Sequence, residues 1–165
     1  MDIKRLPAAT KCLVDANIII HHLNGTSVEC RDFLHRVAKR EIDAYLTTVI
    51  IAEVMHRQML IEAVDRGLVS AGRAVRKLKD QPQIIEKLTD HITQVKRLLE
   101  LPFTVISVNV SDISNSHRLR TEHQLFVNDS INLASAMRVG IRHIITHDSD
   151  FERATGTTVW SPTDI

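Results

Sequence analysis

Acidic side chains next to short apolar segments are the feature of this sequence best suited to chemistry. Asp15 ends the apolar run Cys12–Val14, and Asp148 follows a second run, His143–Thr146. In an open α/β sheet, sites form at the carboxyl ends of the strands, so we expect these positions to meet. Together with acidic residues near the start of two predicted helices, the candidates are Asp15, Glu53, Asp129, Asp148 and Asp150.

The chemistry that such a group of carboxylates suggests is metal-assisted hydrolysis. Carboxylates directed into a protein are costly to desolvate unless positive charge meets them. No Lys or Arg lies within a few residues of Asp15 or Asp129 to provide it. Mg²⁺ or Mn²⁺ would do so through oxygen ligands, and could activate a water for attack on a phosphodiester.

Each acidic residue also has an alternative local role. Glu53 could pair with Arg57 one helical turn later, and Asp129 in the first turn of a helix complements the helix dipole. Asp15 could cap the helix that follows it, and the two later aspartates are common turn residues. For each residue considered alone, the local role is favoured over a role in a shared site. For all the carboxylates considered together, their common position at strand and helix ends favours a single shared site.

The elements that must position these side chains alternate along the chain. Strands are predicted at residues 12–14, 44–46, 103–108, 143–146 and 157–160. Helices are predicted at 16–23, 26–40, 47–66, 69–79, 83–101, 111–123 and 128–140, after a loose arm at 1–10. This alternation favours an α/β fold with a mostly parallel sheet flanked by helices.

Composition is that of an ordinary globular protein, with 44% hydrophobic and 25% charged residues and a net charge of +1. At 165 residues we expect a single domain over 1–165. Cys12 and Cys30 are expected to be buried free thiols in a reducing compartment. There is no signal-peptide pattern and no apolar span of about 20 residues. We therefore expect a cytoplasmic protein without membrane contact.

Three other kinds of site are disfavoured. The nine histidines are scattered without the spacing of a helical zinc site. With five glycines in all, no GxGxxG or GKS/GKT nucleotide-binding motif occurs. A phospho-acceptor signalling domain also gathers acidic groups at strand ends, but it requires a lysine after the last core strand. Residues 143–165 contain no lysine.

Four segments together resemble the PIN-domain nucleases, most closely the VapC-type toxins of toxin–antitoxin pairs. They are VDAN at Asp15, TTVIIAEV at Glu53, NDSINLASA at Asp129 and THDSDF at Asp148. The match is most specific over residues 125–153. The resemblance implies a Rossmann-like PIN domain with a central, mostly parallel sheet of four to five strands. It also implies a Mg²⁺- or Mn²⁺-dependent endoribonuclease that cleaves RNA by metal-activated water.

The resemblance also implies roles for individual residues. The catalytic, metal-binding quartet would be Asp15, Glu53, Asp129 and Asp148. Asp150 would be an adjoining metal position, and Asn17 and Thr146 would hold carboxylates or water in place. A small antitoxin partner and a homodimer are implied as well. The chain departs from shorter members in its long helical segment 67–101, and in Gln124, where a glycine is frequent.

The RNA-binding surface and the biological role stay open. Residues that could contact phosphates are Arg73, Arg76, Lys77, Arg118 and Arg120, although a basic helix near 73–79 is also consistent with a solvated surface. One alternative is a housekeeping RNA-processing nuclease with the same site. Another is a catalytically silent PIN-like module that binds RNA or protein, against which the complete acidic set argues.

Overall fold

Five short parallel strands form the centre of the molecule, in the order β3-β2-β1-β4-β5. This computed structural model describes all 165 residues. The strands are β1 (Lys11–Val14), β2 (Asp43–Thr47), β3 (Thr104–Ile106), β4 (His143–Ile145) and β5 (Thr158–Trp160). Leu13 lies opposite Tyr45 on one side and Ile144 on the other. The α/β fold with a mostly parallel sheet is confirmed, and all five strands are parallel.

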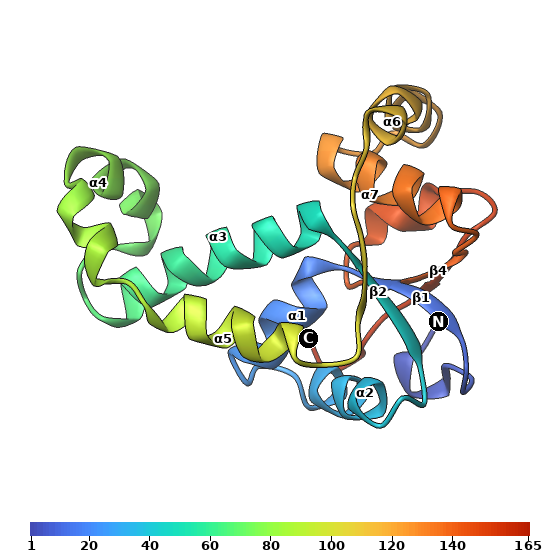
Figure 1. Cartoon of the computed structure of the whole chain (residues 1–165), viewed down its shortest axis with the longest axis horizontal. Coiled ribbons are helices and arrows are strands. Elements are labelled where there is room, and N and C mark those ends of the chain that lie inside the picture. Colours follow the sequence, from blue (N-terminus) through green and yellow to red (C-terminus); the bar gives the residue numbers. More distant parts are fainter.

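Helices cover both faces of this sheet (Figure 1). On one side lie α1 (Ala16–Leu23) and α2 (Val28–Ala38), and on the other lie α6 (Val110–His123) and α7 (Val127–Arg138). Because neighbours cover β1 on both faces, its residues Cys12–Val14 are fully buried, as expected for a continuous apolar run. The chain leaves β1 and β4 in different directions, which makes the gap between their ends a topological switch point.

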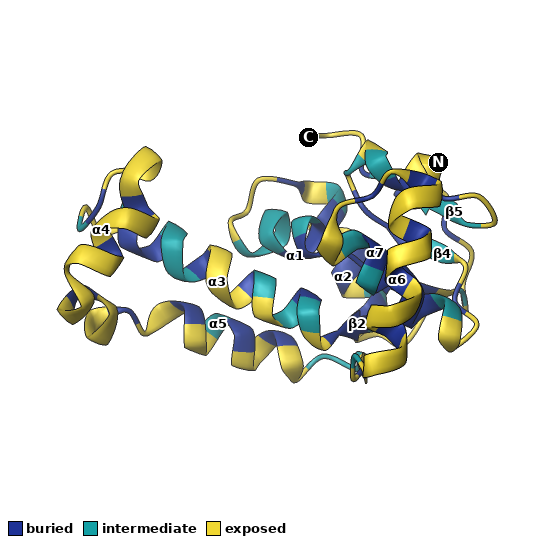
Figure 2. Cartoon of the chain, turned by 90° about the horizontal axis from the view of Figure 1, so that it is seen from above, coloured by how far each residue is buried: buried dark blue, intermediate teal, exposed yellow.

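A helical arm extends from the sheet (Figures 1 and 2). It begins with the long helix α3 (Thr48–Asp65), turns through η2 (Ala71–Arg73), α4 (Ala74–Asp80) and η3 (Pro82–Lys87), and returns along α5 (Asp90–Leu99). The arm has its own small apolar cluster, formed by Ala63, Val69, Ala74, Leu78, Ile84 and Leu88. Figure 2 shows that most of the other residues of the arm are exposed or half-buried.

Within the arm, the predicted helices were too long. The predicted helix 83–101 is η3 followed by α5, because the carboxylate of Glu62 accepts hydrogen bonds from Thr89 N at 2.9 Å and His91 N at 3.0 Å. These bonds satisfy amides that begin α5, so the helix restarts there. The predicted basic helix 69–79 starts only at Ala74, after η2. Apolar periodicity could not reveal a break made by a side chain far away in the sequence.

The expectation of a loose N-terminal arm was wrong. The Met1 amino group donates to Val159 O at 2.8 Å, and Ile3 N donates to Ser161 O at 3.0 Å. The side chains of Ile3 and Leu6 are buried in the main core. The N-terminal residues therefore pack beside the end of β5 and close one edge of the structure.

Candidate active site

The neighbouring ends of β1 and β4 hold Asp15 in one orientation. Thr146 Oγ1 and Asn17 Nδ2 each donate to Asp15 Oδ2 at 2.7 Å, and Ala16 N donates to Oδ1 at 2.7 Å. Only 8% of Asp15 is exposed. The last bond makes Asp15 the N-cap of α1, so the local role expected from sequence coexists with its place at the strand end.

The same network connects Asp15 to the loop after β4. Thr146 Oγ1 accepts from Asp148 N at 2.9 Å, and Asn17 Oδ1 accepts from His147 N at 3.1 Å. Asp148 in turn caps the short helix η4 (Ser149–Arg153) by accepting from Asp150 N at 2.8 Å. Asn17 and Thr146 therefore join, through hydrogen bonds, the two segments that carry Asp15 and Asp148.

Two helices bring the other carboxylates to this edge. Glu53 lies in the second turn of α3 and Asp129 in the first turn of α7. Thr47, the N-cap of α3, is joined to Asn132 in the second turn of α7, and both side chains are buried. The Thr47 hydroxyl donates to Asn132 Oδ1 at 2.6 Å and accepts from Ile50 N at 3.0 Å. This link fixes α7 against the N-terminal end of α3.

The carboxylates are close enough to change one another's proton affinity. Burial, followed by the charges of Asp15, Asp148, Glu53 and Asp150, raises the pKa of Asp129 to about 7. Burial is also the largest influence on Asp15, whose pKa is raised to about 6 although its hydrogen bonds from Thr146 and Ala16 lower it. The structure therefore brings the five acidic residues near enough to interact through their charges, and we call them the acidic cluster.

Positive side chains reach only the margin of the acidic cluster. Arg57 Nε lies 3.7 Å from Glu53 Oε1, as the helical spacing predicted, and Arg153 Nη1 lies 2.9 Å from Asp150 Oδ1. Asp15, Asp129 and Asp148 form no ion pair with Lys or Arg. The centre of the cluster is therefore negatively charged and lacks a protein cation.

Hard oxygen donors of this kind suit Mg²⁺ or Mn²⁺. As the side chains lie, no three His, Cys, Asp or Glu residues converge closely enough to form a ready ligand set. Mutual repulsion favours such a spread arrangement, and a cation between the carboxylates would offset that repulsion. The feature that fits such an ion is a pair of carboxylates without a cationic partner, the buried Asp15 and the half-buried Asp129.

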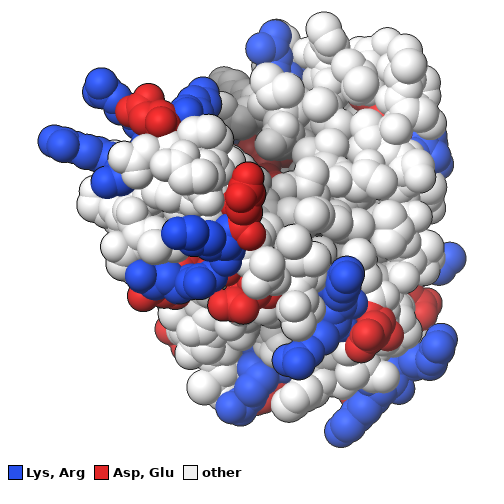
Figure 3. All heavy atoms as spheres, turned by 60° about the vertical axis from the view of Figure 1, so that its left-hand side comes forward, with Lys and Arg blue, Asp and Glu red and all other residues white.

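The structure divides the predicted RNA-binding residues into two separate groups, and the first group lines one cavity. Arg73, Arg76 and Lys77 lie on η2 and α4 at the tip of the arm, and Arg118 and Arg120 lie on α6, far from that tip in Figure 1. Figure 3 shows Lys and Arg side chains over the arm, interspersed with carboxylates.

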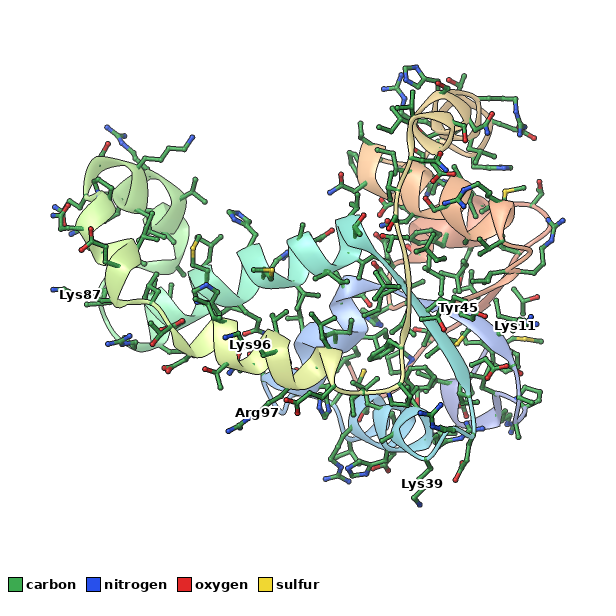
Figure 4. All side chains as sticks on the ribbon, viewed as in Figure 1. Lys11, Lys39, Tyr45, Lys87, Lys96 and Arg97 are labelled. Carbon is green, nitrogen blue, oxygen red and sulfur yellow. The ribbon has the colours of Figure 1, made fainter.

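Other basic side chains lie along the outer side of the arm. Lys87 and Arg97 project there, as Figure 4 shows. On the face that Figure 3 shows, the positive charge of the arm is interspersed with carboxylates.

Two features at the edge of the acidic cluster were not predicted from the sequence. Besides pairing with Asp150, Arg153 donates from Nε to His123 O at 3.2 Å and from Nη2 to Gln124 O at 2.9 Å. It thereby holds the turn between α6 and α7 beside the cluster. The i,i+3 spacing of Asp150 and Arg153 was a signal for the ion pair, but not for the two carbonyls. The second feature is the exposed ring of Phe126 in that turn.

The fold and the acidic cluster define a parallel α/β protein with a carboxylate-rich site at a topological switch point. The family model described as PIN domain matches residues 12–156 of this chain. The chain therefore belongs to the PIN domain family, as the sequence motifs suggested. No curated protein sequence matches the chain.

Solved structures with the same fold include toxin–antitoxin proteins. VapBC2 from Rickettsia felis, bound to a DNA fragment from its promoter, is 13% identical with a TM-score of 0.58, over 92% of this chain and 98% of that chain. VapC20 from Mycobacterium tuberculosis, a toxin that cleaves the sarcin–ricin loop, is 12% identical with a TM-score of 0.57, over 87% and 95%. DNA-bound VapBC from Salmonella typhimurium is 14% identical with a TM-score of 0.55, over 92% and 98%. At these identities the likeness shows the fold.

Proposed function

We propose that this protein is a Mg²⁺- or Mn²⁺-dependent endoribonuclease. The observation that supports the proposal is the acidic cluster itself. Burial is the largest cause of the raised pKa values of Asp15, to about 6, and Asp129, to about 7, yet neither side chain has a cationic partner in the protein. These carboxylates are costly to ionise where they lie, at the topological switch point of the sheet. A cation that binds between them would explain why the structure keeps them together.

In this proposal Asp15, Glu53, Asp129 and Asp148 hold the ion, and Asp150 adjoins them. A bound Mg²⁺ or Mn²⁺ would neutralise charge and activate water for attack on a phosphodiester. Asp15 is the best oriented of the ligands, because three hydrogen bonds fix both of its oxygens.

The supporting groups act through Asp15 and the loop that carries Asp148. Asn17 and Thr146 keep the carboxylate of Asp15 facing the cluster and prevent the two loops from separating. Arg153 keeps Asp150 and the α6–α7 turn at the edge of the cluster. The protein therefore supplies a preorganised support for the site, which reduces the rearrangement needed when substrate binds.

We further propose that the nuclease is the toxin of a toxin–antitoxin pair, is inhibited by a small antitoxin, and forms a homodimer in the cytoplasm. Support comes from the VapBC and VapC structures that share the fold. No helix of this chain has both the length and the apolar character required to cross a bilayer. RNA would be held by phosphate contacts from Arg73, Arg76 and Lys77 on the arm or Arg118 and Arg120 on α6.

RNA cleavage tests the nuclease proposal. Wild-type protein should cut RNA with Mg²⁺ or Mn²⁺ and lose the activity in EDTA. Asp15→Asn should be inactive, because the amide keeps the shape of the side chain and removes its charge. Asp65→Asn, which removes an exposed carboxylate on the arm, is the matched control and should remain active. Equal cleavage by the wild-type protein and Asp15→Asn would exclude the proposed site.

Growth after expression tests the toxin proposal separately. Expression of the wild-type protein should arrest growth, while Asp15→Asn should not, and co-expression of a cognate antitoxin should restore growth. Cleavage in vitro without growth arrest would instead favour a housekeeping RNA-processing role for the same site.

A further inference from the structure

Phe126 is an exposed aromatic ring beside the acidic cluster. It is 74% exposed, whereas the other aromatic rings of Phe, Tyr and Trp are buried or half-buried: Phe33, Tyr45, Phe103, Phe151 and Trp160. Exposing a phenyl ring forgoes the stabilisation that its burial would provide. Only 4% of the residues in this chain are aromatic. An exposed ring next to the proposed site therefore indicates that a ligand covers it.

The position of Phe126 relative to the carboxylates is fixed by the backbone. Phe126 is the N-cap residue of α7, and its carbonyl accepts from Ser130 N at 3.0 Å. Asp129 follows three residues later, in the first turn of α7. On the other side, Arg153 binds the carbonyls of His123 and Gln124 while pairing with Asp150. The backbone that carries the ring is therefore held between Asp129 and Asp150, two members of the cluster.

We propose that Phe126 stacks on an unpaired nucleobase next to the phosphodiester that the acidic cluster would cut. This inference rests on the proposed nuclease function and extends it, because it names a residue that would position the substrate beside the acidic cluster. A flat ring binds any base through its π-face, and such stacking is a common means of holding single strands. Phe126 would position the base while the cluster acts on the adjoining phosphate.

The surroundings of the ring favour a base over a protein surface. The adjacent Val127 is 55% exposed. Gln124, at the end of α6, and Asn128, in the first turn of α7, are polar and exposed. The strongly exposed Val110 lies at the other end of α6, about 20 Å along the helix. Protein interfaces usually use contiguous apolar patches of several hundred Å², whereas a single ring is sufficient for stacking.

The test uses short single-stranded RNA in which one base, moved along the strand, is the fluorescent analogue 2-aminopurine. Binding is measured in EDTA, with RNA integrity checked on a gel, so that stacking is read without cleavage. Wild type and Phe126→Trp should quench the fluorescence at one position. Phe126→Leu, which keeps an apolar side chain of similar size, should lose the quenching and bind about tenfold more weakly. Val110→Ala is the matched control and should behave as wild type.

A second arm replaces the base at the quenched position by an abasic site, which should abolish the difference between wild type and Phe126→Leu. The proposal is overturned if Phe126→Leu binds and quenches like the wild-type protein. It is also overturned if the only change is in oligomeric state, measured by light scattering, since the ring would then pack against protein. If the protein quenches the fluorescence at one position but does not cleave RNA with added metal, the proposed nuclease function is wrong and the stacking by Phe126 still stands.

Discussion

Replacing Asp129 by Asn should stabilise the metal-free protein at neutral pH. The pKa of Asp129 is raised from 3.8 to about 7, first by burial and then by the surrounding carboxylates. A group with a raised folded-state pKa binds more protons when folded than when unfolded between those two values. The free energy of unfolding therefore falls as the pH rises from about 4 to about 7.

The magnitude follows from the size of this pKa difference. At about 1.4 kcal/mol per pKa unit, the difference between 3.8 and about 7 sets an upper bound of about 4.5 kcal/mol for the fully ionised carboxylate. Solvent screening of this half-buried side chain reduces the expected effect to about 1–3 kcal/mol. The asparagine variant lacks this penalty. Its advantage over the wild-type protein should be near zero at pH 4, grow through pH 5 and 6, and approach a few kcal/mol at pH 8.

Urea unfolding in EDTA at each pH measures this difference. Burial lowers the pKa of His21 and His22, so the contribution of these two residues to the free energy of unfolding rises with pH. The free energies of variant and wild type are therefore compared at the same pH. Asp65→Asn on the exposed arm should change the stability by less than about 0.5 kcal/mol. If Asp129→Asn were no more stable than the wild-type protein at pH 8, the description of a crowded, charge-disfavoured cluster would be wrong.

Three further substitutions test the supporting structure. Thr146→Val removes the hydroxyl that bonds Asp15 and should lower the urea-unfolding free energy by about 1–3 kcal/mol, whereas Thr146→Ser should retain most of it. Glu62→Gln should speed hydrogen exchange of α5, because it removes the charge that accepts the hydrogen bonds at the start of that helix. Burial raises the pKa of Glu62, but hydrogen bonds led by those from His91 lower it to about 2. The stabilisation by the ionised Glu62 is therefore present above about pH 4.5 and is lost as the pH falls toward 2. Gln124→Gly should raise the melting temperature, by an amount equivalent to about 1 kcal/mol, because Gln124 has φ of 56°; an unchanged melting temperature would show that no strain is relieved.

Much of the fold was predictable because its signals are local. The apolar run Cys12–Val14 indicated a buried strand, and Ser27 and Thr47 proved to be helix caps whose side chains accept from Cys30 N and Ile50 N. The positions of the acidic residues at strand and helix ends followed from the same elements. Their gathering around one space follows from a parallel sheet in which β1 and β4 are neighbours.

The remainder depended on contacts between distant residues. Glu62 interrupts a predicted helix through bonds to Thr89 and His91, and no pattern within residues 83–101 contains that information. Packing of Ile3 beside Ser161 likewise depends on a strand at the other end of the chain. Gln124 is informative in retrospect, since its left-handed backbone conformation is the physical reason why a glycine suits that turn.

Direct Mn²⁺ binding is the most direct test of the central claim that the acidic cluster holds a divalent ion. The loss of the free Mn²⁺ signal in electron paramagnetic resonance, titrated with protein at pH 7.5, reports binding without any substrate. The wild-type protein should bind, and Asp15→Asn and Asp129→Asn should each weaken binding by tenfold or more, while Asp65→Asn should not. Equal Mn²⁺ affinity in all four proteins, or no binding by the wild-type protein, would contradict the proposed metal centre.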